Sequence, residues 1–144
     1  MFKKILIATD GSEPAQHALK YAIESAKKWD SKLIVISVVP QIPPQLTTGP
    51  GFNIDSYIDQ LKKTHQKILN KSKELIKKEC PKIKVSTKLE NGRPANVIID
   101  VAEKENVDLI IMGSRGYGGI TGWILGSTSK HVVDHCTKPV LIIK

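Results

Sequence analysis

The sequence holds only two cysteines, Cys80 and Cys136, and neither belongs to a C-x-x-C pair. Two scattered cysteines are too few for a disulfide framework, so we expect both thiols to be reduced. Long apolar runs are also missing, because runs such as residues 5–8 and 33–36 fall far short of the roughly 20 residues that span a bilayer. The apolar stretch near the start is shorter than the roughly 7–15 residues of a secretory signal. We therefore expect a cytoplasmic protein that has no membrane partner.

Arginine and aromatic residues are scarce, although the formal net charge is +8. Only Arg93 and Arg115 are arginines among 22 basic residues, and aromatic residues make up 5% of the chain. Recognition of bases favours arginine forks, and binding of single strands relies on aromatic stacking. Many lysines fall within residues 62–78, where a helical wheel places them opposite an apolar arc. The lysines therefore indicate the solvated face of an amphipathic helix, and no nucleic acid partner is expected. The apolar arc holds Ile58, Leu61, Ile68, Leu69, Leu75 and Ile76.

The length of 144 residues, with 25% charged and 40% hydrophobic residues, suits one globular domain. Neither a domain boundary nor an internal repeat is visible in the sequence. We therefore expect residues 1–144 to form a single domain.

Short β-rich runs alternate with longer amphipathic segments along the chain. This alternation predicts an α/β fold, a doubly wound parallel sheet with helices on both faces and right-handed crossovers. Ligands of such sheets bind beyond the carboxyl ends of the strands, where the strand order reverses. Asn91 and Gly92 read as a turn, and the residues between the second strand and the second helix read as a Pro- and Gly-rich loop. Strands are predicted at residues 4–9, 32–39, 82–90, 109–112 and 140–143, and helices at residues 14–28, 55–79, 94–105 and 127–135.

Six of the ten glycines lie within residues 113–126, after the fourth predicted strand. Glycine lets backbone N–H groups converge on an anion, and the helix predicted from Ser127 would add the positive end of its dipole. The hydroxyl groups of Ser127, Thr128 and Ser129 could donate as well. A surface loop whose glycines only form turns, with Ser127 as an ordinary N-cap, explains the same pattern. Glycine density alone leaves both interpretations open.

Two familiar nucleotide-binding patterns are absent from the sequence. No Gly-Lys pair exists for a P-loop, and Thr121 stands where the third glycine of a G-x-G-x-x-G motif would fall. The spacing Gly113-x2-Gly116-x9-Gly126-Ser127 is present instead, together with the opening KILIATDGSEPAQHAL and the closing CTKPVLIIK. Over essentially its whole length the sequence resembles the universal stress protein family, in particular its ATP-binding subgroup.

The resemblance implies the strand order 3-2-1-4-5 and a Rossmann-like fold of the adenine nucleotide alpha hydrolase type. It also implies an ATP-binding module in stress response or signalling, with a signalling partner that the sequence does not identify. Family members commonly form a homodimer through the last strand, here Val140–Ile143. Some relatives lack the glycine motif and bind no ATP, so a dimeric scaffold that binds no nucleotide is the alternative.

The family's nucleotide-binding positions can be transferred to this sequence one by one. The resemblance implies contacts to the nucleoside near the end of the first strand, a backbone contact to adenine near the end of the second, and contacts to sugar and phosphates after the fourth. The implied residues are Ala8, Thr9, Asp10, Val38, Met112, Gly113, Arg115, Gly116, Gly126, Ser127, Thr128 and Ser129.

Some of these residues also have a purely structural explanation. Asp10 before Gly-Ser is typical of a turn or a helix cap as well as of a ligand contact. Val38 and Met112 would be apolar strand ends in any such fold, so their assignment depends on the resemblance. Arg115 is favoured for phosphate over Arg93, which lies in a predicted turn.

No catalytic set emerges from the remaining residues. His131 and His135 are spaced i, i+4 beside Cys136, but a zinc site normally needs three or four ligands. His65 falls in the apolar arc of its helix and reads as a packed residue. No serine has an identifiable histidine and aspartate partner, and no general base for attack on a phosphate is evident.

We therefore expect a protein that holds a nucleotide with little or no hydrolysis and has no metal ligands among its side chains. A divalent ion, Mg²⁺ or Mn²⁺, is expected to bridge the phosphates. The sequence does not distinguish ATP from AMP, ADP or a cyclic nucleotide.

Overall fold

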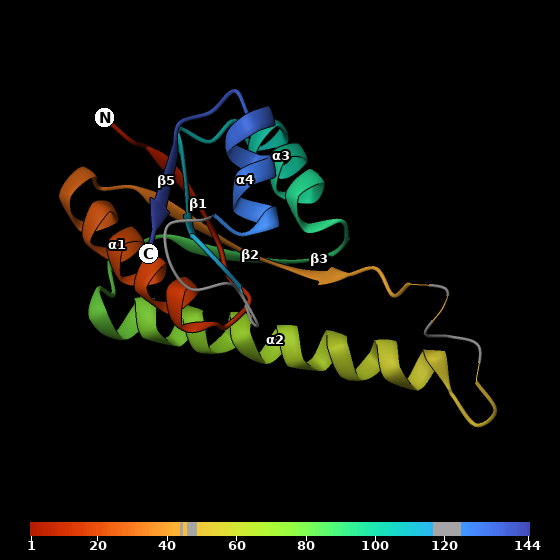
Figure 1. The fold of residues 1–144 in the computed structure, drawn as a ribbon. Coiled ribbons are helices and arrows are strands. Elements are labelled where there is room, and N and C mark those ends of the chain that lie inside the picture. The colour runs from red at the N-terminus through yellow and green to blue at the C-terminus, as the bar shows by residue number, and fades with distance from the viewer. Residues whose placement is uncertain (44, 46–48, 117–124) are drawn as a thin grey trace.

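The computed structural model describes residues 1–43, 45, 49–116 and 125–144 of the chain. Strands and helices alternate along these residues, in the order that the sequence predicts (Figure 1). The strands are β1 (Lys4–Ala8), β2 (Lys32–Pro40), β3 (Val85–Gly92), β4 (Leu109–Gly113) and β5 (Val140–Ile143). The helices are α1 (Glu13–Trp29), α2 (Ile54–Glu79), α3 (Pro94–Lys104) and α4 (Ser127–His135).

The five strands form one parallel sheet of order β3-β2-β1-β4-β5, which confirms the predicted order. In its register Ile5 of β1 lies beside Leu33 of β2 on one side and beside Leu109 of β4 on the other. The chain leaves β1 toward β2 and leaves β4 toward β5, so the strand order reverses between β1 and β4. The carboxyl ends of these two strands therefore mark the place where a ligand crevice is expected.

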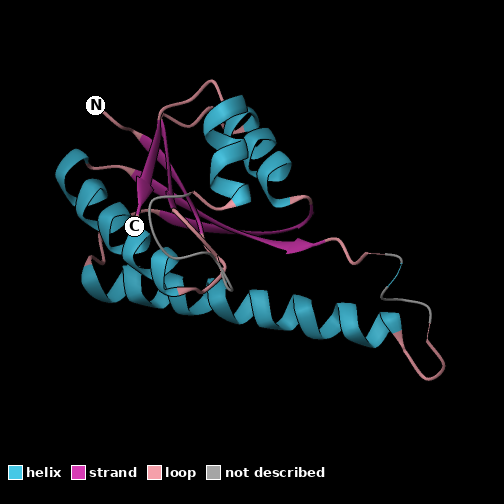
Figure 2. Ribbon diagram, in the orientation of Figure 1, coloured by secondary structure: helices cyan, strands magenta, loops and turns pink. Residues whose placement is uncertain are grey.

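Helices cover both faces of the sheet, with α1 and α2 on one face and α3 and α4 on the other (Figures 1 and 2). Side chains of the strands alternate between these layers, as the pleat requires. Ile5 and Ile7 of β1 pack in the cluster with α1 and α2, whereas Leu6 packs with α3 and α4. Each such side chain stabilises the fold by about 1.5–3 kcal/mol when fully buried. This two-sided burial explains why the central strands are apolar at nearly every position.

The end of β4 lies unusually close to the beginning of α1. A Cβ atom on Gly113 would lie 2.8 Å from the carbonyl carbon of Pro14 and 3.0 Å from the backbone nitrogen of Ala15. Pro14 belongs to the first turn of α1, and Ser12 caps that turn by accepting a hydrogen bond from the Ala15 N–H. The backbone of α1 therefore fits against β4 only because residue 113 has no side chain.

Helix α2 is amphipathic in the way that the sequence predicts. Its buried residues are Leu69, Ser72 and Ile76, all in the second half of the helix, while the lysines within residues 62–78 are exposed. The first turns of α2 extend beyond the sheet (Figure 1). In the described part of the chain, no helix has the length and apolar character needed to cross a membrane.

The predicted turn at Asn91 and Gly92 is wrong, because both residues belong to β3. They lie beside Val39 and Pro40 of β2, and this pairing extends the strand beyond the local turn signal. The strand also begins later than predicted, at Val85. Gly92 has φ +136°, a conformation that favours glycine and lets the chain leave the strand just before α3.

Replacing Gly113 with alanine is expected to lower the free energy of unfolding by about 1–3 kcal/mol, since the added Cβ would overlap the backbone of Pro14. Urea denaturation measures the effect. Gly49→Ala is the matched control, because a Cβ at position 49 meets no atom within 4 Å in the described part of the chain. Equal stability of the two variants would contradict the close approach of β4 and α1.

Candidate functional site

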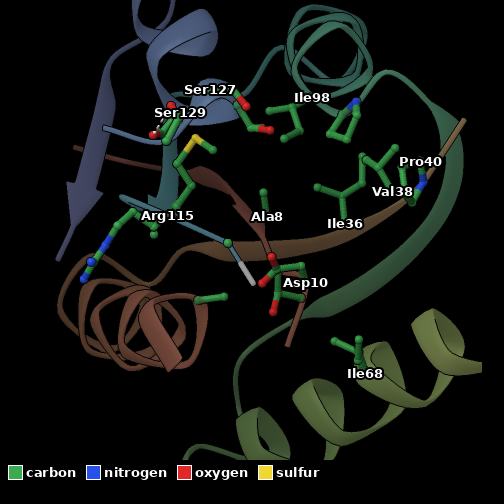
Figure 3. A pocket seen from close by; sticks show the side chains of 18 of the residues that line it. Ala8, Asp10, Ile36, Val38, Pro40, Ile68, Ile98, Arg115, Ser127 and Ser129 are labelled. Atoms are coloured by element: carbon green, nitrogen blue, oxygen red, sulfur yellow. Dashed lines mark hydrogen bonds between the residues drawn. The ribbon is translucent and has the colours of Figure 1, made fainter. Parts of the chain in front are cut away.

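A cavity of about 880 Å³ opens at the carboxyl edge of the sheet, where the strand order reverses. Its walls come from the ends of β1, β2 and β4, the first turns of α3 and α4, and the middle of α2 (Figure 3). This size lies within the range of about 300–1,000 Å³ that is usual for small-molecule sites.

The chain after β1 forms a compact turn whose hydrogen bonds fix the direction of Asp10. The Gly11 N–H donates to Thr9 Oγ1 (3.1 Å), and the Ser12 N–H donates to Asp10 Oδ1 (2.9 Å). Of the two structural roles predicted for Asp10, it therefore stabilises a turn and does not cap the helix, because the N-cap of α1 is Ser12. One carboxylate oxygen holds the turn, and the other remains on the cavity side.

Gly116 approaches this second oxygen so closely that a side chain would collide with it. A Cβ on Gly116 would lie 2.5 Å from Asp10 Oδ2. The segment after β4 therefore passes directly beside the turn after β1. A larger residue at position 116 would have to displace the Asp10 carboxylate.

The N-terminus of α4 presents backbone N–H groups at the cavity. Its N-cap is Gly126, and no side chain of the described residues caps the helix. The first hydrogen bond within the helix runs from the Lys130 N–H to the Gly126 carbonyl, so the N–H groups of Ser127, Thr128 and Ser129 precede the hydrogen-bonded ladder. Such a terminus carries partial positive charge and is suited to an anion.

Ser129 stabilises this terminus through contacts of its hydroxyl group with the backbone. This residue is 2% exposed, and its hydroxyl group lies 2.8 Å from the Ser114 carbonyl oxygen and 3.1 Å from that of Gly126. The Gly126 N–H also donates to the Ser114 carbonyl at 2.7 Å. The Ser129 hydroxyl proton is therefore engaged with backbone, and its side chain positions the turn. Ser127 and Thr128 remain as hydroxyl donors at the cavity.

The opposite half of the cavity is apolar (Figure 3). Ile36, Val38 and Pro40 of β2 line it from the sheet, and Ile98 and Ile68 line it from α3 and α2. The Arg115 side chain extends away from Ser127 in the same view. One cavity thus joins an apolar compartment over β2 to an N–H-rich compartment after β4.

His65 adds a titratable group on the α2 side of the cavity. Its Nδ1 lies 2.7 Å from Ser37 Oγ, and Ser37 is almost fully buried. Burial lowers the pKa of His65 below its ordinary value of 6.5, while the negative charge of Asp10 opposes this shift. The described residues contain no group of three or more His, Cys, Asp or Glu side chains placed to hold a metal ion.

The model of the family described as "Universal stress protein family" matches residues 1–144. The chain belongs to this family. Universal stress protein YxiE of Bacillus subtilis is 35% identical over 100% of both chains. Universal stress protein MJ0531 of Methanocaldococcus jannaschii is also 35% identical, over 100% of this chain and 83% of its own.

Solved structures of universal stress proteins have the same fold. The structure of MJ0577 from Methanocaldococcus jannaschii is 32% identical, with a TM-score of 0.77 over 100% of this chain and 96% of that chain. Two more distant structures are each 22% identical to this chain. One is a universal stress protein in complex with cAMP, with a TM-score of 0.75 over 99% of this chain and 97% of that chain. The other is a universal stress protein from Archaeoglobus fulgidus in complex with dAMP, with a TM-score of 0.69 over 99% of this chain and 98% of that chain. The likeness to these two shows the fold alone.

All twelve residues implied by the resemblance to universal stress proteins line the cavity. Three of the six glycines in the 113–126 segment, at positions 118, 119 and 122, lie outside the described residues.

The sequence did not reveal several apolar residues that line the cavity, because a side chain that faces a cavity and one that faces the core follow the same periodicity. For His65 a signal existed, since a histidine within an apolar arc needs a polar partner. The unassigned lining residues are Ala15, Ile36, Pro40, Thr64, His65, Ile68, Pro94, Ile98 and Leu125.

An NMR titration is expected to give His65 a pKa below 6.5 in the folded protein. Asp10→Asn should lower this pKa further, because it removes the charge that favours the imidazolium. A lowered pKa means that the unfolded state binds the proton more readily, so His65 reduces stability as the pH falls below about 6.5. A folded-state pKa at or above 6.5 would contradict this arrangement.

Proposed function

We propose that this universal stress protein binds an adenine nucleotide, ATP in particular, in the cavity between β1 and β4. The observation that carries the proposal is one cavity that combines an apolar compartment with an α4 N-terminus that no side chain of the described residues caps. An anionic phosphate chain suits the first, and a flat, weakly polar base suits the second. The relatives whose structures hold cAMP and dAMP have this same fold, which supports the choice of adenine.

The residues fit a phosphate chain in a specific way. Gly116 and Gly126 leave backbone exposed where a Cβ would meet the Asp10 carboxylate or the Ser114 carbonyl oxygen. The N–H groups at the start of α4 would then donate to phosphate oxygens, assisted by the hydroxyl groups of Ser127 and Thr128. A bound Mg²⁺ or Mn²⁺ would neutralise charge on the phosphates.

We propose a signalling role without a hydrolytic step. Bound nucleotide would favour one arrangement of the segment between Arg115 and Gly126, and a partner would recognise that arrangement. Residues 117–124 of this segment lie outside the described part of the chain. Little or no hydrolysis is expected, because the sequence offers no evident general base for attack on a phosphate. A dimeric scaffold that binds no nucleotide is the alternative.

Denaturation of the purified protein is expected to release an adenine nucleotide that mass spectrometry identifies. Calorimetric titration of the emptied protein with ATP and Mg²⁺ should then show binding. Gly116→Val is expected to weaken ATP binding at least about tenfold, equivalent to about 1.4 kcal/mol, because its side chain displaces Asp10. Gly49→Val is the control, since position 49 is open and lies outside the cavity. No released nucleotide and no heat with ATP, ADP or AMP would overturn the proposal and favour the scaffold.

We also propose a homodimer that forms through β5. This strand lies at the edge of the sheet, and Leu141 on it is 37% exposed. The carbonyl oxygens of Pro139 and Ile143 accept hydrogen bonds from the N–H groups of Ile110 in β4 and of Ser114 just after it. Because backbone groups of successive residues in a strand point to opposite sides, those of Val140 and Ile142 point away from the sheet. An apolar edge strand with outward-pointing backbone groups is suited to pairing with its own copy.

Sedimentation analysis is expected to give a dimer for the native chain and a monomer for Leu141→Lys. The substitution places like charges near each other across a twofold axis and removes an exposed apolar side chain. Tyr57→Lys is the control, because Tyr57 is also exposed but belongs to the first turn of α2, which lies on the side of the molecule away from β5 (Figure 1). A native monomer would contradict the proposed dimer.

A further inference from the structure

The inner face of α2 brings one polar ring to the cavity, and no motif of the sequence assigns it a role. His65 lines the cavity from α2 and contacts the buried Ser37 of β2 through Nδ1 at 2.7 Å. Its neighbours on the cavity side are Thr64 and Ile68. Among the described residues, no hydrogen bond occupies the other ring nitrogen, Nε2.

The contact with Ser37 selects one tautomer of His65. The Ser37 hydroxyl has a single proton, and within the described residues His65 Nδ1 is the partner found for it. If that proton is donated to Nδ1, the hydroxyl is satisfied and the imidazole carries its own proton on Nε2. The opposite arrangement would leave a buried hydroxyl proton without an acceptor, which is unfavourable. His65 therefore faces the cavity as a neutral Nε2–H donor.

The position of His65 across the sheet indicates what it can reach. Helix α2 packs on β2 and β3, whereas the α4 N-terminus follows β4, and β1 lies between β2 and β4. Two strand spacings separate β2 from β4, a distance of about 10 Å. Helices α2 and α4 cover opposite faces of the sheet, but residues of both line the same cavity at the carboxyl ends of the strands. A nucleotide whose phosphates lie at α4 would therefore place its nucleoside beyond the ends of β1 and β2, toward His65.

We propose that His65 determines nucleoside specificity by donating its Nε2–H to an acceptor atom of the bound nucleoside, and that Ser37 positions the ring for this contact. The inference rests on the proposed function of the cavity. The acceptor is a lone pair on either a base nitrogen or a ribose hydroxyl oxygen. Because an imidazole that donates from Nε2 does not accept there, the site favours nucleosides that present an acceptor at this point.

Calorimetry with ATP, AMP and inorganic tripolyphosphate tests the contact. His65→Leu is expected to weaken binding of ATP and AMP about three- to tenfold and to leave tripolyphosphate binding unchanged. His65→Gln should recover most of the affinity, since its amide retains an N–H donor. Gln66→Leu is the matched control, because Gln66 is exposed on the same helix and bonds to Asn70. Thermal unfolding checks that each variant is folded.

A nucleotide without ribose hydroxyl groups distinguishes the two acceptors. If His65 contacts a ribose hydroxyl oxygen, His65→Leu and the native protein should bind 2′,3′-dideoxy-ATP equally well. If it contacts the base, the loss of affinity should persist with that nucleotide.

The tautomer of His65 tests whether Ser37 positions the ring, because a residue that only contributed to folding would not change this tautomer. ¹⁵N NMR of the nucleotide-free protein is expected to show the proton of His65 on Nε2. Ser37→Ala should mix the two tautomers and weaken AMP binding, and Ser37→Thr should restore both.

Two outcomes would overturn the inference in different ways. A native protein that takes up no adenine nucleotide defeats the proposed function and the inference with it. Native binding of ATP that His65→Leu leaves unchanged, or a proton found on Nδ1, defeats the inference alone.

Discussion

The parallel pairing of β1 with β4 is the interaction on which the rest of the structure depends. At the centre of the sheet, where helices cover both faces, the buried residues Ile5, Leu6 and Ile7 lie beside the buried residues Leu109, Ile110 and Ile111. The helix after β1 packs on one face and the helix after β4 packs on the other. The chain therefore leaves the ends of β1 and β4 toward opposite faces of the sheet, and the described residues leave a cavity between these strand ends. The cavity is therefore a consequence of the topology.

The fold was predictable from the sequence because its signals are local and repeated. Alternating apolar runs, the proline in the first turn of α1 and the amphipathic pattern of α2 each point to one element, and the elements together point to one architecture. The strand order came from the resemblance to a family. The failure at Asn91 and Gly92 has a physical cause, since pairing with Val39 and Pro40 of a neighbouring strand outweighs the local preference for a turn.

The candidate site was predictable where the backbone determines it and less so where side chains do. Gly113 and Gly116 lie where another part of the chain comes too close for a Cβ, and a Cβ on Gly126 would make a tight contact of 3.2 Å with the Ser114 carbonyl oxygen, so the spacing of the three glycines reflects a constraint of packing. The hydroxyl of Ser129 illustrates the opposite case, because only the folded structure reveals that a backbone carbonyl engages it. The partnership of His65 with Ser37 joins two elements 28 residues apart, and no local pattern encodes it.

The uneven burial of α2 gives this helix two halves of different local stability. Leu69, Ser72 and Ile76 anchor the second half to the core, whereas the turns before His65 extend beyond the sheet and are largely exposed. Helical turns that pack on nothing are only marginally stable in water. We therefore expect amide protons near the start of α2 to exchange with solvent through local fraying, whereas those near its end exchange only on global unfolding. His65 lies at the boundary between the exposed first half of α2 and the half that packs on the core. The wall of the cavity that it forms is thus the last part of α2 that the core still holds in place.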